Sequence, residues 1–467
     1  MSTVKTPGES QGDRGAGVKV SAPSAPSQLS LSCRPIRYNR PLLSPVEWVT
    51  VINLECSAVP RVDFAIPYIC LAAAAFLTTF ACTPLAHRLA VKLDAVDYPS
   101  KRRINTKPIP RLGGLAVFAG LSVACILQIV GTLNWGWPSA LVPHPSMAIN
   151  YPMLAVSFLM IVVTGALDDV IQLSPRLKLA GQIASAIIAA ASGLLIHAVV
   201  NPFGAGELDL GWLSYPVTII YLVAYTNIIN LIDGLDGLAS GLAAIAAGSM
   251  FSFAILAGRG DAASLSIALI GACLAFLRYN FHPASIFLGD SGSLLLGFAL
   301  GTISLMNVSR VAALTSMIMP LIVAGVPILD TLSAIIRRKR AHVSIGQADK
   351  GHIHHRLIQE GFDQRQAVLF IYAWTILLSI GAATINQVRV EFRVVIFLIL
   401  LASSIAFALR LHLFEPVLLH HYNAQEDEGE IISPDSPAFA EERERIVEER
   451  RRRREERGTH RHGKGTP

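Results

Sequence analysis

The sequence predicts an all-α, polytopic membrane protein, and three observations support this prediction. Of the 467 residues, 52% are hydrophobic and only 15% are charged, whereas soluble domains carry roughly 25% charged residues. The mean hydropathy is +0.50. The apolar residues also gather in long uninterrupted segments, and about 20 mostly apolar residues are enough for a helix to span a bilayer. The lipid bilayer is therefore the first partner that the composition implies.

Eleven segments are long and apolar enough to be membrane spans, and several of them contain Gly or Pro, which spanning helices tolerate. The predicted spans are approximately 64–86, 112–133, 151–167, 179–200, 212–230, 237–257, 262–277, 291–307, 311–335, 366–386 and 392–411.

The distribution of positive charge predicts the orientation of these spans. Seven Lys and Arg residues lie in the loop at 87–111 and seven more at 336–365, whereas the loops at 134–150 and 201–211 contain none. Basic loops stay on the cytoplasmic side, so an odd number of spans puts the N-terminus outside and the C-terminus in the cytoplasm. The net charge of +6 then suits an anionic membrane surface, and no nucleic-acid partner is expected. The six cysteines show no CxxC spacing, so neither a disulfide framework nor a zinc site is expected.

Both ends of the chain differ from the spanning region. Residues 1–60 are rich in Ser, Pro, Gly and charge and predict a disordered tail. Residues 61–415 form the predicted transmembrane domain, and 416–467 form a charged cytoplasmic tail. The run AEERERIVEERRRRREERG in this tail predicts a solvated helix, with a tether to anionic lipid as the alternative.

An acidic pair, Asp168 and Asp169, ends the third predicted span on the cytoplasmic side. Adjacent helical residues point about 100° apart, so the two carboxylates can serve different partners. Lys178 lies nearby and could meet a phosphate group. The plainer alternative is that the charges only mark the membrane interface.

The run NIINLIDGLDGLA at 227–239 places a polar residue at every third position, which stacks neighbours in the series along one side of a helix. The series consists of Asn227, Asn230, Asp233 and Asp236. Amides and carboxylates in this arrangement can bind ribose hydroxyls or the edges of a base. A polar helix cap is the alternative without a ligand.

The run FLGDSGSLLLG at 287–297 puts Asp290 at the start of a span, where the helix dipole favours a negative charge. A simple helix cap is one explanation of this aspartate. Phe287 offers an aromatic face on which a base could stack.

Two basic stretches complete the set of candidate sites. GHIHHRL at 351–357 contains His352, His354, His355 and Arg356, a combination that suits a pyrophosphate because imidazole donates hydrogen bonds to phosphate oxygens. A zinc site and a plain solvated loop are the alternatives. In DYPSKRRINTKPIPRLGG at 97–114, three prolines stiffen a loop whose cations, Arg111 among them, could close over an anionic substrate.

These five motifs, in this order and on one face of the membrane, resemble the polyprenyl-phosphate N-acetylhexosamine-1-phosphate transferase family. The resemblance covers about residues 64–411 and is greatest for the undecaprenyl-phosphate alpha-N-acetylglucosaminyl-1-phosphate transferases. HIHHRL is similar to that branch, whereas the phospho-MurNAc-pentapeptide transferases carry three consecutive histidines followed by an acidic residue.

The resemblance implies an enzyme that transfers N-acetylglucosamine 1-phosphate from UDP-GlcNAc to undecaprenyl phosphate and releases UMP, initiating a lipid-linked cell-envelope glycan. It implies a bacterial inner-membrane protein with its active site on the cytoplasmic face. The oligomeric state is left open, with a homodimer as one alternative. Because two highly charged phosphates must approach each other, Mg²⁺ is the expected cofactor, with Mn²⁺ as an alternative ion. MurNAc-pentapeptide or another UDP-N-acetylhexosamine stays open as donor. Outside the enzyme class, the alternative is an ion-coupled transporter, which predicts carboxylates near the bilayer midplane.

The resemblance also implies a role for each candidate residue. Asp290 with Asp168 and Asp169 would hold the metal ion, and Phe287 would stack on uracil. Lys178 and Arg111 would contact the substrate. The remaining members divide into a nucleoside-binding set, Asn227, Asn230, Asp233 and Asp236, and a pyrophosphate-binding set, His352, His354, His355 and Arg356.

Two chemical schemes remain open for the acidic pair. In one, an aspartate is the nucleophile and carries a covalent sugar phosphate; in the other, it is a base that deprotonates the lipid phosphate. The second pKa of a phosphomonoester lies near 6, so the lipid phosphate is largely dianionic at neutral pH and can attack directly. Single displacement is therefore favoured, with the pair as metal ligand and positioning group.

Overall fold

A computed structural model describes residues 65–98, 107–137, 149–200, 207–307, 325–340, 352–359, 362–388, 390–411 and 413. The predicted tails at 1–60 and 416–467 lie outside these ranges. The described part of the chain is almost entirely helical, with two small pairs of antiparallel strands. Eight of its helices are long and apolar enough to cross a membrane. The prediction of an all-α polytopic membrane protein is therefore confirmed.

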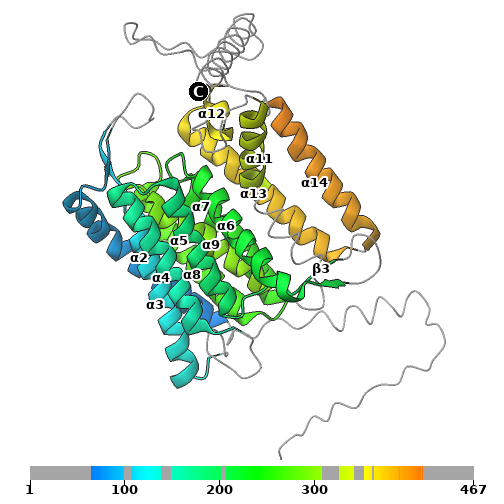
Figure 1. The fold of residues 1–467 in the computed structure, drawn as a ribbon, viewed down its shortest axis with the longest axis horizontal. Coiled ribbons are helices and arrows are strands. Elements are labelled where there is room, and N and C mark those ends of the chain that lie inside the picture. Colours follow the sequence, from blue (N-terminus) through cyan, green and yellow to red (C-terminus); the bar gives the residue numbers. More distant parts are fainter. Residues whose placement is uncertain are drawn as a thin grey trace, which may run out of the picture. The chain divides into compact units, whose positions relative to one another are not determined.

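Helices α2 to α9 follow one another along the described chain and form the bundle that carries the acidic motifs (Figure 1). They are α2 (Ala65–Lys92), α3 (Gly113–Asn134), α4 (Tyr151–Ile171), α5 (Pro175–Ala191), α6 (Ser214–Ile232), α7 (Leu238–Leu256), α8 (Gly260–Asn280) and α9 (Gly289–Asn307).

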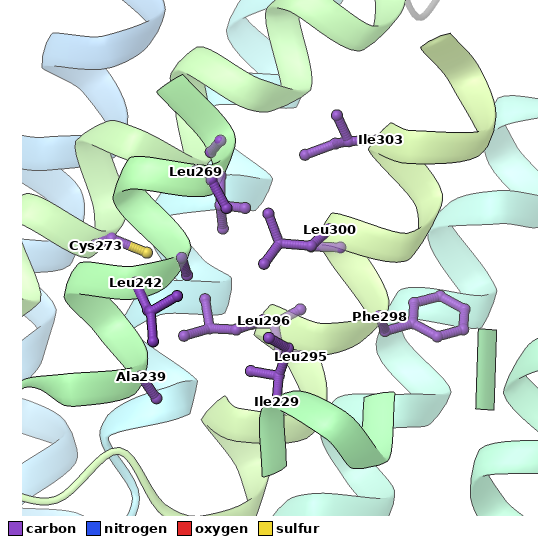
Figure 2. Close-up of a cluster of buried hydrophobic side chains, with 14 of the residues drawn as sticks. Ile229, Ala239, Leu242, Leu269, Cys273, Leu295, Leu296, Phe298, Leu300 and Ile303 are labelled. Carbon is purple, nitrogen blue, oxygen red and sulfur yellow. The ribbon is translucent and has the colours of Figure 1, made fainter. Parts of the chain in front are cut away.

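Helix α9 is the centre of this bundle. Every residue from Ser291 to Asn307 is buried, and α9 packs against α3, α4, α6, α7 and α8. Figure 2 shows Leu296 and Leu300 of α9 beside Leu242 of α7 and Leu269 of α8. Because α9 is held by its neighbours, the position of its first turn, which contains Asp290, is fixed within the bundle.

Glycines let three helices approach one another at the start of α9. A Cβ added to Gly114 of α3 would lie 2.1 Å from the backbone nitrogen of Gly292, and one added to Gly165 of α4 would lie 2.5 Å from the carbonyl oxygen of Asp290. Larger residues at these points would push the helices apart. The close approach brings the end of α4, with its acidic pair, against the start of α9.

Two strand pairs connect the helices. β1 (Val96–Asp97) pairs with β2 (Ile109–Pro110), with Val96 opposite Pro110. β3 (Ala198–Val200) pairs with β4 (Glu207–Asp209), and the short 3₁₀ helix η2 (Gly211–Leu213) follows before α6.

Four helices complete the described chain: α11 (Gly325–Arg340), α12 (Ile353–Gln359), α13 (Gln364–Gln387) and α14 (Val390–Arg410). Helix α13 packs on α7 and α14, and α11 packs on α6 (Figure 1). An Asp363 capping box, with Gln366 as its third residue, begins α13.

One predicted span differs from the structure in extent, and another is described only in part. The span predicted at 179–200 is a helix of 17 residues, Pro175–Ala191, because Ser192 and Gly193 turn the chain, with Gly193 at φ 93°. Residues 198–200 then form β3 instead of a helix end. Of the span predicted at 311–335, only the part from residue 325 is described, and the segment predicted at 392–411 forms α14.

Candidate active site

Four helix ends meet at one cluster of charged and amide side chains. The ammonium group of Lys178 donates a hydrogen bond of 2.6 Å to Asp290 Oδ1 and lies 3.0 Å from Asp168 Oδ2. The amide of Asn230 donates to the same Asp290 oxygen at 2.6 Å and to Ser293 Oγ at 2.7 Å. The structure thus brings together α4, α5, α6 and α9 through residues that the sequence singled out separately.

Local sequence signals place Lys178 at this cluster. Ser174 caps α5 by accepting a hydrogen bond from the backbone N–H of Leu177, and Pro175 occupies the first helical position. Since α4 ends only a few residues earlier, at Ile171, this cap turns the first turn of α5, with Lys178, back toward the acidic pair.

Asp168 has a second partner in its own helix end. Its Oδ1 accepts a hydrogen bond of 2.7 Å from the backbone N–H of Leu173, past the left-handed Gln172 that terminates α4. Its side chain is only 10% exposed, so the pair with Lys178 is largely shielded from solvent.

Asp169 caps α9. Its Oδ1 accepts from the backbone N–H of Asp290 at 2.8 Å, and its Oδ2 accepts from that of Ser291 at 2.9 Å. The residue is 1% exposed. Gly289 makes the contact sterically possible, because a Cβ there would lie 2.5 Å from Asp169 Oδ2. The two members of the acidic pair therefore face different partners.

The polar series 227–236 does not lie along one helix, in contrast to the sequence-based prediction. Helix α6 ends at Ile232, since Asp233 and Gly234 leave the helical conformation and Gly237 has φ 79°. Asp236 therefore lies in the turn after the helix. Its Oδ2 contacts His282 Nδ1 at 2.8 Å and accepts the backbone N–H of Ala284 at 3.0 Å.

The other members of this series also have separate environments. Asn227 exchanges hydrogen bonds with Gln182 of α5, its Nδ2 donating at 2.6 Å, so it ties α6 to α5. Asp233 is partly buried at the end of α6. Burial, together with the negative charges of Asp290 and Asp169, raises the pKa of the Asp233 carboxyl to about 8.

The segments of Arg111 and Phe287 are held together by their backbones. The N–H of Phe287 donates to the carbonyl of Pro110 at 2.8 Å, and its own carbonyl accepts from Gly113 at 3.1 Å. The Arg111 guanidinium lies 3.9 Å from Asp97. The described end of the first basic loop, from residue 107, is thus fixed beside the start of α9, with the Phe287 side chain partly exposed.

The histidine segment forms a second cluster, around Asp330 of α11. His352 Nδ1 lies 2.8 Å from Asp330 Oδ2, and the N–H of Ile353 donates to Asp330 Oδ1 at 2.8 Å. Asp330, His352 and Arg356 are buried, and the side chains of His354 and His355 lie outside the described atoms. A single carboxylate therefore fixes both the His352 ring and the start of α12.

Sequence reasoning missed Asp330, His282 and Gln182. A signal existed for Asp330, because a carboxylate inside an apolar span is costly and is usually functional. His282 and Gln182 carry no comparable local signal, since their importance depends on contacts with residues 46 and 45 positions away.

The donor set around Lys178 is compatible with Mg²⁺. Among the described residues, no group of three or more His, Cys, Asp or Glu side chains is arranged to hold a metal ion. Mg²⁺, however, is commonly bound by one or two carboxylates together with water and substrate phosphates. Asp168 and Asp290 provide two such carboxylates, whereas both oxygens of Asp169 already accept N–H groups of α9.

Comparison with known proteins identifies the class and then the family. Residues 151–308, which include both aspartates that contact Lys178, match the model described as Glycosyl transferase family 4. The chain is 39% identical over 325 residues to the probable undecaprenyl-phosphate N-acetylglucosaminyl 1-phosphate transferase of Bacillus subtilis (strain 168), covering 70% of this chain and 87% of that protein.

Two further relatives extend the comparison. The decaprenyl-phosphate N-acetylglucosaminephosphotransferase of Mycolicibacterium smegmatis is 37% identical over 334 residues, covering 67% of this chain and 80% of that protein. The phospho-N-acetylmuramoyl-pentapeptide-transferase of Moorella thermoacetica is 30% identical over 291 residues, covering 58% and 82%. The chain belongs to the polyprenyl-phosphate N-acetylhexosamine-1-phosphate transferase family, which confirms the resemblance of its motifs.

Proposed function

We propose that the protein transfers N-acetylglucosamine 1-phosphate from UDP-GlcNAc to undecaprenyl phosphate or a related polyprenyl phosphate, with release of UMP. The observation that carries this proposal is the cluster in which Lys178 joins Asp168 and Asp290 at the meeting point of four helix ends. The relatives named as N-acetylglucosaminyl 1-phosphate transferases support the same reaction. The lipid-linked product initiates a cell-envelope glycan.

The side chains of the cluster have distinct tasks in this reaction. Asp290 and Asp168 would hold a divalent cation, Mg²⁺ or Mn²⁺, which supplies charge neutralisation on the pyrophosphate. Asn230 fixes the Asp290 carboxylate by donating to its Oδ1. Asp169 holds the start of α9, and with it Asp290, in place.

Bond formation requires little activation of the acceptor. An oxygen of the dianionic lipid phosphate attacks the sugar-linked phosphorus of UDP-GlcNAc, and the bond from that phosphorus to the bridging oxygen breaks, so UMP leaves with that oxygen. No proton has to be removed by the acidic pair. This scheme assigns Asp168 and Asp169 to binding and positioning and needs no covalent enzyme intermediate.

The reaction is assigned to the cytoplasmic face of the bacterial inner membrane. The basic segments at 87–111 and 336–365 support this side, because positive charge is retained in the cytoplasm. Eleven spans with the N-terminus outside remain the proposed topology, and a homodimer is a proposed assembly.

The transporter alternative is disfavoured by the position of the carboxylates. Asp168 is in the last turn of α4, and Asp290 is in the first turn of α9, so both lie at helix ends instead of mid-span. MurNAc-pentapeptide or another UDP-N-acetylhexosamine remains the alternative donor, and the Moorella thermoacetica relative carries the former substrate in its name.

An assay with purified protein tests the proposal. The protein, Mg²⁺ and undecaprenyl phosphate are incubated with each of a panel of UDP-sugars, and lipid products and UMP are measured by mass spectrometry. UDP-GlcNAc should give the highest turnover, and Asp290→Asn should remove most of it while the fold is retained. The assignment would be overturned if UDP-MurNAc-pentapeptide were the one donor that gave a lipid product, or if no donor gave one.

The chemical scheme is tested without acceptor. UDP-GlcNAc labelled in the sugar-linked phosphate is added to the protein alone, and the mixture is quenched in acid and separated on a gel. Single displacement predicts no label on the protein and no UMP. Stoichiometric labelling that disappears in Asp168→Asn or Asp169→Asn would establish a covalent intermediate.

A further inference from the structure

The ammonium group of Lys178 lies between Asp168 and Asp290, the two carboxylates that would hold a divalent cation. It lies 2.6 Å from Asp290 Oδ1 and 3.0 Å from Asp168 Oδ2, and the Lys178 side chain is only 19% exposed. A lysine held this closely between two carboxylates is their counter-ion.

The remaining lone pairs of these carboxylates are partly committed as well. Asp290 Oδ1 accepts from Asn230 in addition to Lys178, and Asp168 Oδ1 accepts from the backbone N–H of Leu173. A carboxylate oxygen has about two acceptor positions. A divalent cation held by Asp168 and Asp290 would therefore compete with the ammonium group for them, because two cations side by side would repel each other in this partly buried site.

We infer that Lys178 is a tethered competitor of the divalent cation: it neutralises Asp168 and Asp290 and leaves them when the cation binds. The identity of the cation rests on the proposed function. The displaced ammonium group, on a long flexible side chain, is then available to an anionic phosphate of the substrate. The Lys178 ammonium group cannot contact the carboxylates and a substrate phosphate at the same time. Cation binding to Asp168 and Asp290 therefore makes this positive charge available to the substrate.

Because Lys178 competes with the cation, replacing it should tighten cation binding, whereas substitutions in an active site usually weaken the binding of its ligands. Lys178→Met removes the competing charge and keeps most of the apolar stem of the side chain. The variant should lose transferase activity but bind Mn²⁺, without substrate, at least about fivefold more tightly than the unaltered protein, the lower end of typical coupling effects.

Arg176→Met provides the matched control. Arg176 lies in the same first turn of α5 and is exposed. Its replacement removes one positive charge near the site without removing a contact to Asp168 or Asp290. It should leave Mn²⁺ affinity within about twofold, because charges screened by solvent interact weakly.

The decisive measurements are Mn²⁺ titrations of the purified full chain in detergent, in which electron paramagnetic resonance reports the free Mn²⁺ concentration. An affinity of Lys178→Met equal to or lower than that of the unaltered protein refutes the inference, as does an equal gain in Arg176→Met. These titrations contain no substrate, so their failure is separate from a failure of the proposed transferase reaction, which the lipid-product assay reports.

A second measurement does not depend on a variant. Acetic anhydride acylates accessible lysines, and the rate at Lys178 can be followed by peptide mass spectrometry with and without Mg²⁺. Saturating Mg²⁺ should increase the rate at Lys178 and leave the rate at Lys107 unchanged. An unchanged or slower rate at Lys178 would mean that the lysine stays on the carboxylates and that the cation binds elsewhere.

Discussion

Replacing Asp169 with asparagine separates the structural role of this residue from a role in chemistry. Both carboxylate oxygens accept backbone N–H groups of the first turn of α9, at 2.8 and 2.9 Å, and the residue is 1% exposed. The asparagine side chain has one oxygen, and its amino group cannot accept a hydrogen bond. At least one N–H of Asp290 or Ser291 would then be buried without its partner.

The expected loss of stability follows from two contributions. An unpaired buried donor costs about 1–3 kcal/mol. Loss of a negative charge at a helix N-terminus removes up to about 2 kcal/mol in partly buried geometries. Asp169→Asn should therefore lower the free energy of unfolding by about 2–4 kcal/mol and displace Asp290, so turnover should fall as a consequence of the altered α9 start.

Asp168→Asn is the matched comparison. This neighbour contacts Lys178 and the N–H of Leu173, and within the described residues its side chain accepts no hydrogen bond from the backbone of α9. Its replacement should remove turnover with a much smaller effect on stability. The assay is thermal and denaturant unfolding of both variants in detergent, alongside the lipid-product assay. The reasoning would be refuted if Asp169→Asn melted with the unaltered protein while losing as much activity as Asp168→Asn, since Asp169 would then act in the chemistry.

Three further predictions concern helix packing, the histidine cluster and pH. Gly165→Ala should destabilise the protein by about 1–3 kcal/mol and reduce turnover, because its Cβ would lie 2.5 Å from the Asp290 carbonyl oxygen. Gly248→Ala should be tolerated, because its Cβ would have no neighbour nearer than 4.0 Å. Equal melting temperatures of the two variants would contradict this prediction. Asp330→Asn should lower turnover about tenfold or more, because His352 loses a charged partner 2.8 Å away; unchanged kinetics would show that the pairing is dispensable. The Asp233 carboxyl, with its pKa raised to about 8, binds more protons in the folded state than in the unfolded one between about pH 4 and 8, so its contribution to stability falls as pH rises through that range. Asp233→Asn should reduce this fall, as measured by unfolding at pH 5 and pH 9, and an identical pH dependence would contradict the assignment.

Much of the architecture could be predicted because it depends on local composition. A bilayer requires spanning segments to satisfy their own backbone hydrogen bonds, so long apolar runs had to be helices. The predictions at 112–133, 151–167 and 291–307 accordingly agree closely with α3, α4 and α9. The span at 179–200 was predicted too long, because hydropathy alone does not register the turn at Ser192 and Gly193.

The sequence by itself also determined which residues carry charge at the helix ends, and hence the class of chemistry. Asp168, Asn230 and Asp290 were recognisable as candidates from the residue types and their spacing. Their convergence with Lys178 in one cluster was not readable from the chain, because it depends on how α4, α5, α6 and α9 pack.

Only the tertiary structure decided which partner each carboxylate has. Asp168 and Asp169 are neighbours in the sequence, yet one faces Lys178 and the other caps a helix 121 positions away. That division depends on the glycines that bring α4 against α9 and on the direction of each side chain at the contact. Asp330 likewise gained its role only when α11 was placed beside His352. Local sequence sets helix formation because each helix satisfies its hydrogen bonds internally, whereas the pairing of side chains between helices is set by packing over the whole bundle.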